Sequence, residues 1–303
     1  MNTTKVDNFE EAFAKNIVIV FLGFIIIFIN GILVVTFFKN SIFQSDPRYI
    51  LYIHLVMNDM LMIFLSVTLY VLTYAWPFVN VSVCCALLVI GSSTHKNTPL
   101  NLAGMAIERY IAVCKPLHHP QICTVHRTYI LICLIWSVGF IPGLTDVIIV
   151  IATRPLTIFN SFIVCYTLNI YTTKYHEEKT VVVQVIYMSF VWIVLIFTYI
   201  RVLLTAKKAA VDSSAKKAQS TILLHGIQLL LCMLSYLTPV LDMVLIPFFP
   251  AHRTKITFFN YLLTNIIPRL LSPLIYGIRD HKFFKHVRSS FSCKLLIVMV
   301  EPT

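Results

Sequence analysis

Ionisable side chains stand inside the long apolar stretches of this 303-residue chain, where an unpaired charge is costly to bury. Such groups need an opposite charge, a backbone acceptor or a ligand, so each is a candidate for binding or ion pairing. No nucleophile beside a base, no phosphate-binding glycine loop and no metal-ligand spacing accompanies them, which argues against an enzyme, a cofactor and a metal site. The group comprises Asp59, His95, Lys96, Asp146, Asp242 and Arg269.

The stretches that hold these residues are long enough to cross a bilayer as helices. A spanning helix needs about 20 mostly apolar residues, whereas a transmembrane β-barrel uses alternating segments of about 10. The composition excludes a soluble fold, because 58% of the residues are hydrophobic and only 12% are charged, about half the usual fraction. We therefore predict an all-α membrane protein, a seven-transmembrane helix bundle with spans at residues 17–38, 49–74, 84–114, 129–151, 181–205, 220–247 and 257–278.

The distribution of lysine and arginine predicts which face of the bundle is cytoplasmic. An odd number of spans places the termini on opposite faces, and Lys and Arg gather on the cytoplasmic side. The N-terminal face carries Lys5, Lys15, Arg154, Lys174, Lys179, Arg253 and Lys255. The opposite face carries twice as many, namely Lys39, Arg48, Lys115, Arg127, Arg201, Lys207, Lys208, Lys216, Lys217, Arg279, Lys282, Lys285, Arg288 and Lys294. We therefore expect an extracellular N-terminus, a cytoplasmic C-terminus and, for these scattered cations, a membrane surface rather than nucleic acid as partner.

The segments outside the spans are short. Residues 1–16 form the expected extracellular N-terminus and lack the pattern of a cleavable signal peptide. Glycosylation sequons at Asn2 and Asn80 both fall on the predicted outer face. After the bundle of residues 17–278, the cytoplasmic segment 279–303 begins with a basic amphipathic helix that we expect to lie against membrane lipid. Its apolar side carries Phe283, Phe284, Val287 and Phe291, and Cys293 follows as a candidate for acylation.

The end of the third expected span carries the most distinctive motif. It reads Glu108-Arg109-Tyr110-Ile-Ala-Val-Cys-Lys-Pro-Leu, and it resembles rhodopsin-like (class A) G-protein-coupled receptors, specifically odorant receptors of the fish type. The sequence departs from that family in having Ser272 where the seventh helix usually carries Asn or Asp. Further matches occur in order along the chain, at Asn30-Gly31, Pro47-Arg48-Tyr49, Asp59, Trp136, Lys217-Ala218-Gln-Ser220-Thr221 with His225, and Pro268 to Tyr276.

The resemblance implies roles in activation for several residues. It implies that Arg109 pairs with Glu108 at rest and turns toward a heterotrimeric G protein on activation. Asp59 matches the position at which many class A receptors hold sodium. Arg269 lies one turn before Pro273, and we hypothesise that its guanidinium replaces the ion; alternatively, it points toward lipid or a helix end. The other positions implied in activation and coupling are Tyr110, Tyr199, Pro273 and Tyr276.

The same resemblance places a ligand cavity beside the outer half of the third span. His95 and Lys96 lie on the stretch that lines this cavity in the family, and a few convergent polar groups are how such a site gains specificity. Lys96 has an alternative role, the structural neutralisation of Asp242. The residues expected to bind ligand are Ser92, His95, Lys96, Tyr187, Tyr236 and Asp242.

Cysteines near the oxidising outer face are Cys84, Cys85 and Cys165. The resemblance implies a disulfide between Cys84 and Cys165, because Cys84 stands where the bridge of the family begins; Cys85 is the alternative partner.

We predict an odorant receptor of the plasma membrane that binds a small-molecule odorant and activates a heterotrimeric G protein. The first alternative is a class A receptor for another small ligand or a peptide. Amine receptors are disfavoured, because Gly91 stands where they place an aspartate. A transporter or channel is the alternative of another class, but the internal repeats typical of transporters are missing.

Overall fold

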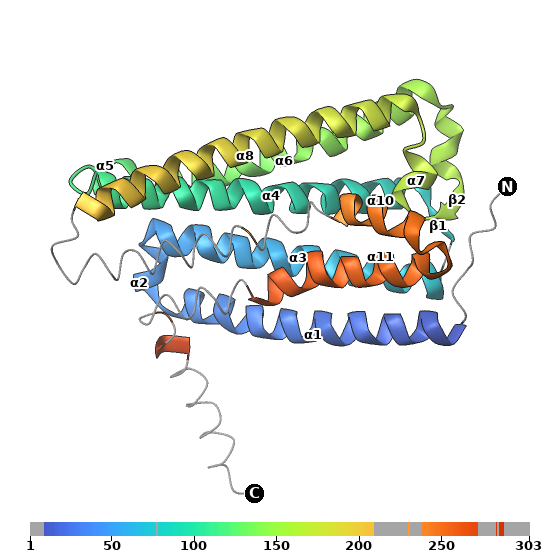
Figure 1. Cartoon of the computed structure of the whole chain (residues 1–303), viewed down its shortest axis with the longest axis horizontal. Coiled ribbons are helices and arrows are strands. Elements are labelled where there is room, and N and C mark those ends of the chain that lie inside the picture. The colour runs from blue at the N-terminus through green and yellow to red at the C-terminus, as the bar shows by residue number, and fades with distance from the viewer. Residues whose placement is uncertain are drawn as a thin grey trace, which may run out of the picture.

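The computed structural model describes residues 9–76, 78–208, 230, 238–271, 283 and 285–287, and this part of the chain is almost entirely helical. Long helices run along the bundle, with α4 packed between α3, α6 and α8, and α1 beside α3 (Figure 1). These helices are α1 (Phe9–Lys39), α3 (Pro47–Ala75), α4 (Val81–Cys114), α6 (Val125–Thr153) and α8 (Lys174–Lys208).

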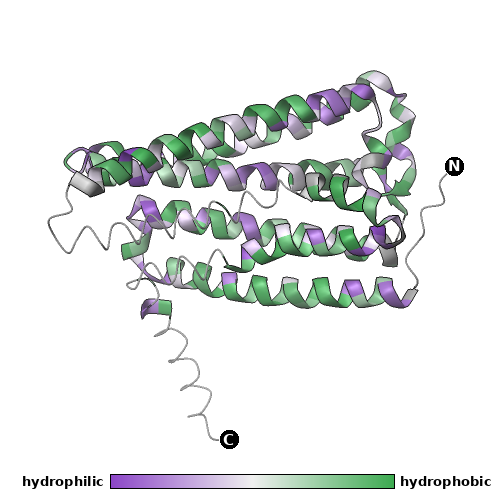
Figure 2. Cartoon of the chain, viewed as in Figure 1, coloured by the Kyte–Doolittle hydropathy of each residue, from purple (hydrophilic) through white to green (hydrophobic). Residues whose placement is uncertain are grey.

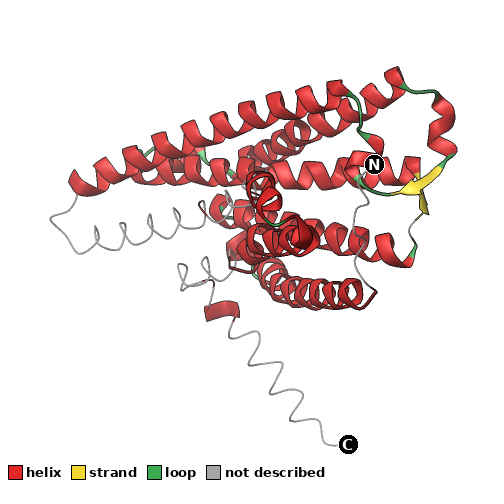
Figure 3. Ribbon diagram, turned by 45° about the vertical axis from the view of Figure 1, so that its right-hand side comes forward, coloured by secondary structure: helices red, strands yellow, loops and turns green. Residues whose placement is uncertain are grey.

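Shorter elements connect the long helices and complete the bundle. Two strands, β1 (Phe78–Asn80) and β2 (Phe162–Val164), pair antiparallel with Val79 opposite Ile163, and they lie at one end of the bundle (Figure 3). We call this end the strand end. The remaining elements are α2 (Ser41–Gln44), α5 (His119–Ile122), the 3-10 turns Leu156–Asn160 and Pro250–His252, α7 (Thr167–Ile170), α10 (Thr238–Phe248), α11 (Arg253–Tyr261) and a π turn at Leu262–Ile266.

Side-chain caps start the helices where the sequence changes from loop to apolar run. The Asp46 carboxylate accepts a hydrogen bond from the Arg48 backbone N–H, and Pro47 occupies the first turn of α3, where its missing N–H costs nothing. Burial alone would raise the pKa of Asp46, but its hydrogen bonds to Arg48 outweigh this effect and lower it below the ordinary value. Asn80 caps α4 and Thr124 caps α6 in the same way.

Four helical segments of the described chain are long and apolar enough to cross a membrane: Glu10–Lys39, Pro47–Leu72, Val125–Thr153 and Lys174–Thr205. They match the first, second, fourth and fifth expected spans. Large apolar side chains are exposed along α1 and α8, as Phe24 and Ile193 show, and Figure 2 colours most of α1 hydrophobic. A bilayer accounts for this exposure, because in water such surface would be unfavourable.

Helix α4 corresponds to the third expected span, but it is more polar than expected and is not among the four helices that are apolar enough to cross a membrane by composition alone. Its position between three other helices explains the difference, since its polar side chains face protein rather than lipid. Asn97 and Asn101 are fully buried, and the Asn101 amide donates a hydrogen bond to the Leu51 carbonyl of α3. From α3, the Asn58 amide donates to the Thr94 carbonyl at 2.9 Å. These bonds satisfy polar groups that lipid could not.

The boundaries of the outer spans differ from those expected. Helix α1 begins at Phe9, so its first two turns fall in the segment 1–16 that we expected before the membrane. The seventh span, expected from residue 257, begins with α11 at Arg253. Of the sixth expected span, the structure describes Leu230 and α10; the rest lies outside the described residues.

Only Phe283 and residues 285–287 of the expected amphipathic helix are described, and they are helical. Phe283 is fully buried against the rings of Phe43, Tyr49 and Tyr52, so it packs in the protein core and not against lipid as expected. Phe284, Phe291 and Cys293 lie outside the residues whose side chains are described.

Candidate ligand and coupling sites

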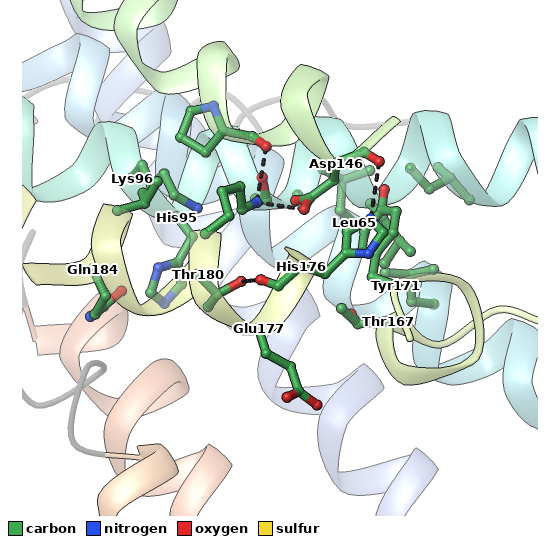
Figure 4. A pocket seen from close by; sticks show the side chains of 18 of the residues that line it. Leu65, His95, Lys96, Asp146, Thr167, Tyr171, His176, Glu177, Thr180 and Gln184 are labelled. Atoms are coloured by element: carbon green, nitrogen blue, oxygen red, sulfur yellow. Dashed lines mark hydrogen bonds and ion pairs between the residues drawn. The ribbon is translucent and has the colours of Figure 1, made fainter. Parts of the chain in front are cut away.

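A cavity of about 670 Å³ opens between α3, α4, α6 and α8 at the strand end (Figure 4). Its size falls in the range of ordinary small-molecule sites. Apolar side chains of α3 and α4 line one part of it, including Leu65, Leu69 and Leu88. Polar side chains converge on the remainder from α4, α6 and the start of α8. They are Ser92, His95, Lys96, Asp146, His176, Glu177, Lys179, Thr180 and Gln184.

An ion pair between α6 and α8 forms one wall of this cavity. The Lys179 ammonium lies 2.5 Å from the Asp146 carboxylate, and it also donates a hydrogen bond to the Pro142 carbonyl at 3.1 Å. Only 16% and 12% of the two side chains are exposed, so water screens the pair weakly. Sequence reasoning missed this pair because it placed Lys179 among the outer surface cations.

A buried histidine holds the beginning of α8 against this wall. His176 is 3% exposed, and its Nε2 lies 3.1 Å from the Asp146 backbone carbonyl. Its Nδ1 lies 2.7 Å from the Thr173 hydroxyl, and its ring stacks on Tyr171 with centroids 5.0 Å apart. Burial raises the pKa of the Tyr171 phenol above its ordinary value. No sequence pattern had singled out His176.

Three of the residues expected to bind ligand line the cavity, namely Ser92, His95 and Lys96. Tyr187 does not line the cavity. Its hydroxyl donates a hydrogen bond to the Val138 carbonyl at 2.5 Å, and its side chain lines a separate apolar groove between α4, α6 and α8. The rotation of α8 about its axis decides this placement, and sequence does not reveal that rotation. Tyr236 and the side chain of Asp242 lie outside the described residues.

Close contact between α4 and α6 forms beside the cavity at two glycines. A Cβ atom on Gly139 would collide with the Asn97 side-chain amide, and one on Gly143 would lie 3.3 Å from the Val89 Cα. Glycines four residues apart on one helix face allow two helices to approach closely in a membrane. The spacing Gly139-x-x-x-Gly143 was the available signal, and our sequence analysis did not use it.

The predicted disulfide between Cys84 and Cys165 is confirmed. It joins the first turn of α4 to the loop after β2, with the two Cα atoms 5.5 Å apart and both residues buried. Cys85 is buried as a free thiol in the same cluster of apolar residues. The side chain of Asn80, next to this bridge, accepts a hydrogen bond from the Ser82 backbone N–H. Glycosylation of Asn80 stays a prediction, as does that of Asn2, which lies outside the described residues.

At the opposite end of α4, the close contact of Glu108 differs from the expected pairing with Arg109. The Glu108 carboxylate lies 2.8 Å from Nε2 of His119 in α5, and in the described part of the chain no ion pair joins it to Arg109. Consecutive residues on a helix point in different directions, whereas His119 approaches from a separate element. Glu108 is buried and Arg109 is partly exposed, so the arginine stays accessible at this end. The Tyr110 ring contacts that of Phe197 at 5.7 Å.

The core of the bundle contains a buried ion pair between α3 and the helix that follows α11. The Arg269 Nε lies 3.7 Å from the Asp59 carboxylate, which also accepts a hydrogen bond from the Thr98 hydroxyl at 3.4 Å. The guanidinium donates a further bond to the Asn265 carbonyl. Both charged side chains are nearly inaccessible to solvent, at 5% and 4% exposure. This contact supports our hypothesis that Arg269 is the counter-ion of Asp59.

Tyr199, Pro273 and Tyr276 are the remaining positions expected to act in activation. Tyr199 on α8 is 40% exposed, and Pro273 and Tyr276 lie outside the described residues. Among the residues that the structure describes, no three His, Cys, Asp or Glu side chains are grouped as metal ligands would be.

A buried disulfide, a ligand-sized cavity at one end and a Glu-Arg-Tyr motif at the other are the features of a seven-helix receptor. The sequence matches the family described as 7 transmembrane receptor (rhodopsin family) over residues 29–276, so the chain belongs to this family of multi-pass membrane receptors, which are not enzymes. It is similar to odorant receptor 131-2 of Danio rerio, with 29% identity over 285 residues that cover 93% of this chain and 87% of that receptor. Human olfactory receptor 2M2 shares 24% identity over 85% of this chain and 78% of its own, and olfactory receptor 51L1 shares 26% over 85% and 84%. The resemblance to odorant receptors is confirmed.

Proposed function

We propose that this protein is an odorant receptor that binds a small odorant in the cavity at the strand end. The observation that carries the proposal is the cavity itself, which combines an apolar wall from α3 with converging polar groups from α4, α6 and α8. This combination suits small molecules with one polar group, because the apolar wall supplies affinity and the polar groups supply orientation. Similarity to odorant and olfactory receptors over most of the chain supports the same function.

The strand end then faces the extracellular space and the Arg109 end faces the cytoplasm. The excess of Lys and Arg on the C-terminal side supports this orientation. The Cys84–Cys165 bridge at the strand end agrees with it, because disulfides persist in oxidising compartments. Antibody labelling of an N-terminal epitope on intact cells tests the orientation, and labelling only after permeabilisation would contradict it.

Signalling proceeds by a shift of population between two arrangements of the bundle. A ligand favours the active arrangement only by as much as it binds that arrangement more tightly. The charged and polar groups that join helices, such as Asp59 with Arg269, are the contacts that can differ between the two states. Arg109 is accessible at the cytoplasmic end and is the group that meets a heterotrimeric G protein.

Arg109→Ala tests the coupling role directly. We expect this variant to reach the cell surface and to bind ligand, but to lose the G-protein response, because Arg109 lies far along α4 from the cavity. The measurement is the cAMP response of membrane-expressed receptor to pooled odorants, with surface labelling of the same cells. Lys115→Ala, just beyond α4, is the matched control and should respond like the wild type. An undiminished response in Arg109→Ala would refute the assignment.

A further inference from the structure

In the part of the chain that the structure describes, one of the two lysines that line the ligand cavity forms an ion pair and the other does not. Lys96 and Lys179 both line it, but the Asp146 carboxylate is held by Lys179 at 2.5 Å. Among the described residues, no carboxylate lies within ion-pair distance of Lys96. In the described part of the cavity, Lys96 is therefore left without an ion-pair partner.

The nearby Glu177 does not supply the missing negative charge. Its side chain is exposed and is directed away from Lys96 and Asp146, as Figure 4 shows. Lys96 also stands near the middle of α4, roughly 22 Å along the helix from Val81, given a rise of about 1.5 Å per residue. Lysines near helix ends extend to the membrane surface, but this one faces the cavity instead.

A second polar group beside Lys96 also lacks a partner. The Ser92 hydroxyl is buried, lines the cavity and has no hydrogen-bond partner in the described part of the chain. Ser92 and Lys96 are four residues apart on α4 and therefore lie on the same helix face. An ammonium and a hydroxyl on one face can together bind the two oxygens of a carboxylate, through one charge-assisted and one neutral hydrogen bond.

The apolar wall of the cavity determines the rest of the ligand. Met62, Leu65 and Leu69 from α3 and Leu87 and Leu88 from α4 present hydrocarbon surface. We propose that the receptor recognises small aliphatic carboxylic acids, with the carboxylate on Lys96 and Ser92 and the chain against these side chains. This inference rests on the proposed function, because it names the ligand class of the same cavity.

The test uses the full-length receptor, purified into lipid nanodiscs, and the straight-chain acids from butanoic to decanoic acid. The alcohol and the primary amine of each chain length serve as matched probes. Ligand-induced change in Tm measures binding without any G protein, and the cAMP response of cells measures signalling separately. The variants are Lys96→Met, Lys96→Arg and Ser92→Ala. Lys255→Met is the matched control, because Lys255 pairs with Glu11 away from the cavity.

We expect at least one acid to stabilise the wild type and Lys255→Met more than its alcohol and its amine do. Lys96→Met should raise the half-maximal acid concentration roughly tenfold or more, the effect of losing a hydrogen bond to a charged group. Lys96→Arg should retain the preference for acids. Ser92→Ala should weaken acid binding by a smaller factor, and this variant keeps the proposal testable if Lys96→Met fails to fold.

Three results would overturn the proposal. The first is the absence of stabilisation by any acid of the series, and the second is acid binding that Lys96→Met leaves unchanged. The third is a stability loss in Lys96→Met that Asp242→Asn reproduces and the double variant relieves, which would make Lys96 the structural partner of Asp242. Neutral odorants that still evoke cAMP in any of these cases would preserve the proposed function. Acids that bind without any G-protein response would support the ligand class and contradict the receptor function.

Discussion

Two pairs of charged side chains inside this receptor join neighbouring helices. Lys179 binds Asp146 between α8 and α6, and Arg269 lies beside Asp59 at the centre. Removing one partner of a buried pair leaves an uncompensated charge, whereas removing both is often nearly neutral. Double-variant measurements therefore separate a real pair from two charges that happen to be close.

The pair at the cavity wall gives the first prediction. Asp146→Asn and Lys179→Gln should each destabilise the receptor by about 3–5 kcal/mol, and the double variant should recover part of that loss. The measurement is the thermal stability of the purified receptor. Lys174→Gln with Glu178→Gln is the matched control, because this pair is largely exposed, with an N–O distance of 3.5 Å. Exposed pairs contribute about 0–1 kcal/mol, so equal effects at both sites would contradict the prediction.

The central pair gives the second prediction. Asp59→Asn and Arg269→Gln should each impair folding or signalling, with partial rescue in the double variant, because each single change strands the other buried charge. A tethered guanidinium in place of a cation should also make agonist affinity insensitive to sodium at constant ionic strength. Strictly additive defects, or an agonist affinity that depends on sodium, would show that Arg269 does not serve as the counter-ion.

At the scale of helices, α4 and α6 depend on glycines for their contact. Asn97 is fully buried between them, and its amide, in the orientation that satisfies it, donates to the Ser93 and Ile135 carbonyls. This arrangement places a polar side chain where Gly139 leaves room for it. The close approach of α4 and α6 at Asn97 therefore depends on the absence of a side chain at Gly139.

Gly139→Val gives the third prediction. The new side chain would collide with Asn97, which would have to break its hydrogen bond to the Ile135 carbonyl of α6 or push α6 outward. We expect a loss of about 2–4 kcal/mol, from overpacking together with a buried amide left unsatisfied, and a lower yield of folded receptor. Gly31→Ala is the control, because a Cβ there meets nothing within 4 Å, and alanine favours a helix. Equal yields of Gly139→Val and the wild type would contradict the contact.

At the scale of the whole molecule, the bridge between Cys84 and Cys165 connects the loop after β2 to α4. The two cysteines are 81 residues apart in sequence, so the bridge closes a long loop. On the chain-entropy model, a loop of this size stabilises the fold by about 4–5 kcal/mol. The chain that follows Cys165 leads to Tyr171 and His176, which line the cavity, so the bridge anchors the segment before this wall.

Loss of this bridge gives the fourth prediction. Cys165→Ser should prevent delivery to the cell surface, because it frees the loop and leaves Cys84 unpaired in an oxidising compartment. Flow cytometry of an N-terminal epitope measures delivery. Cys85→Ser is the matched control, since Cys85 is an equally buried neighbour without a disulfide, and it should be delivered. Normal delivery of Cys165→Ser would count against the structural role of the bridge.

The sequence by itself determined the helical bundle and the position of most spans. This was possible because a bilayer requires about 20 apolar residues per helix, so hydropathy alone reveals the spans. The sequence also identified His95 and Lys96 as candidates, since ionisable residues are rare inside apolar runs, and the family resemblance added Ser92.

Only the tertiary structure decided which side chains meet. It placed Glu108 in direct contact with His119, placed Asp146 against Lys179, and directed Tyr187 away from the cavity. Each of these outcomes depends on how far a helix is rotated about its axis, and that rotation follows from packing against neighbours rather than from the apolar run. Partner choice in a membrane bundle is therefore a property of helix packing, whereas the presence of a buried charge is visible in the chain.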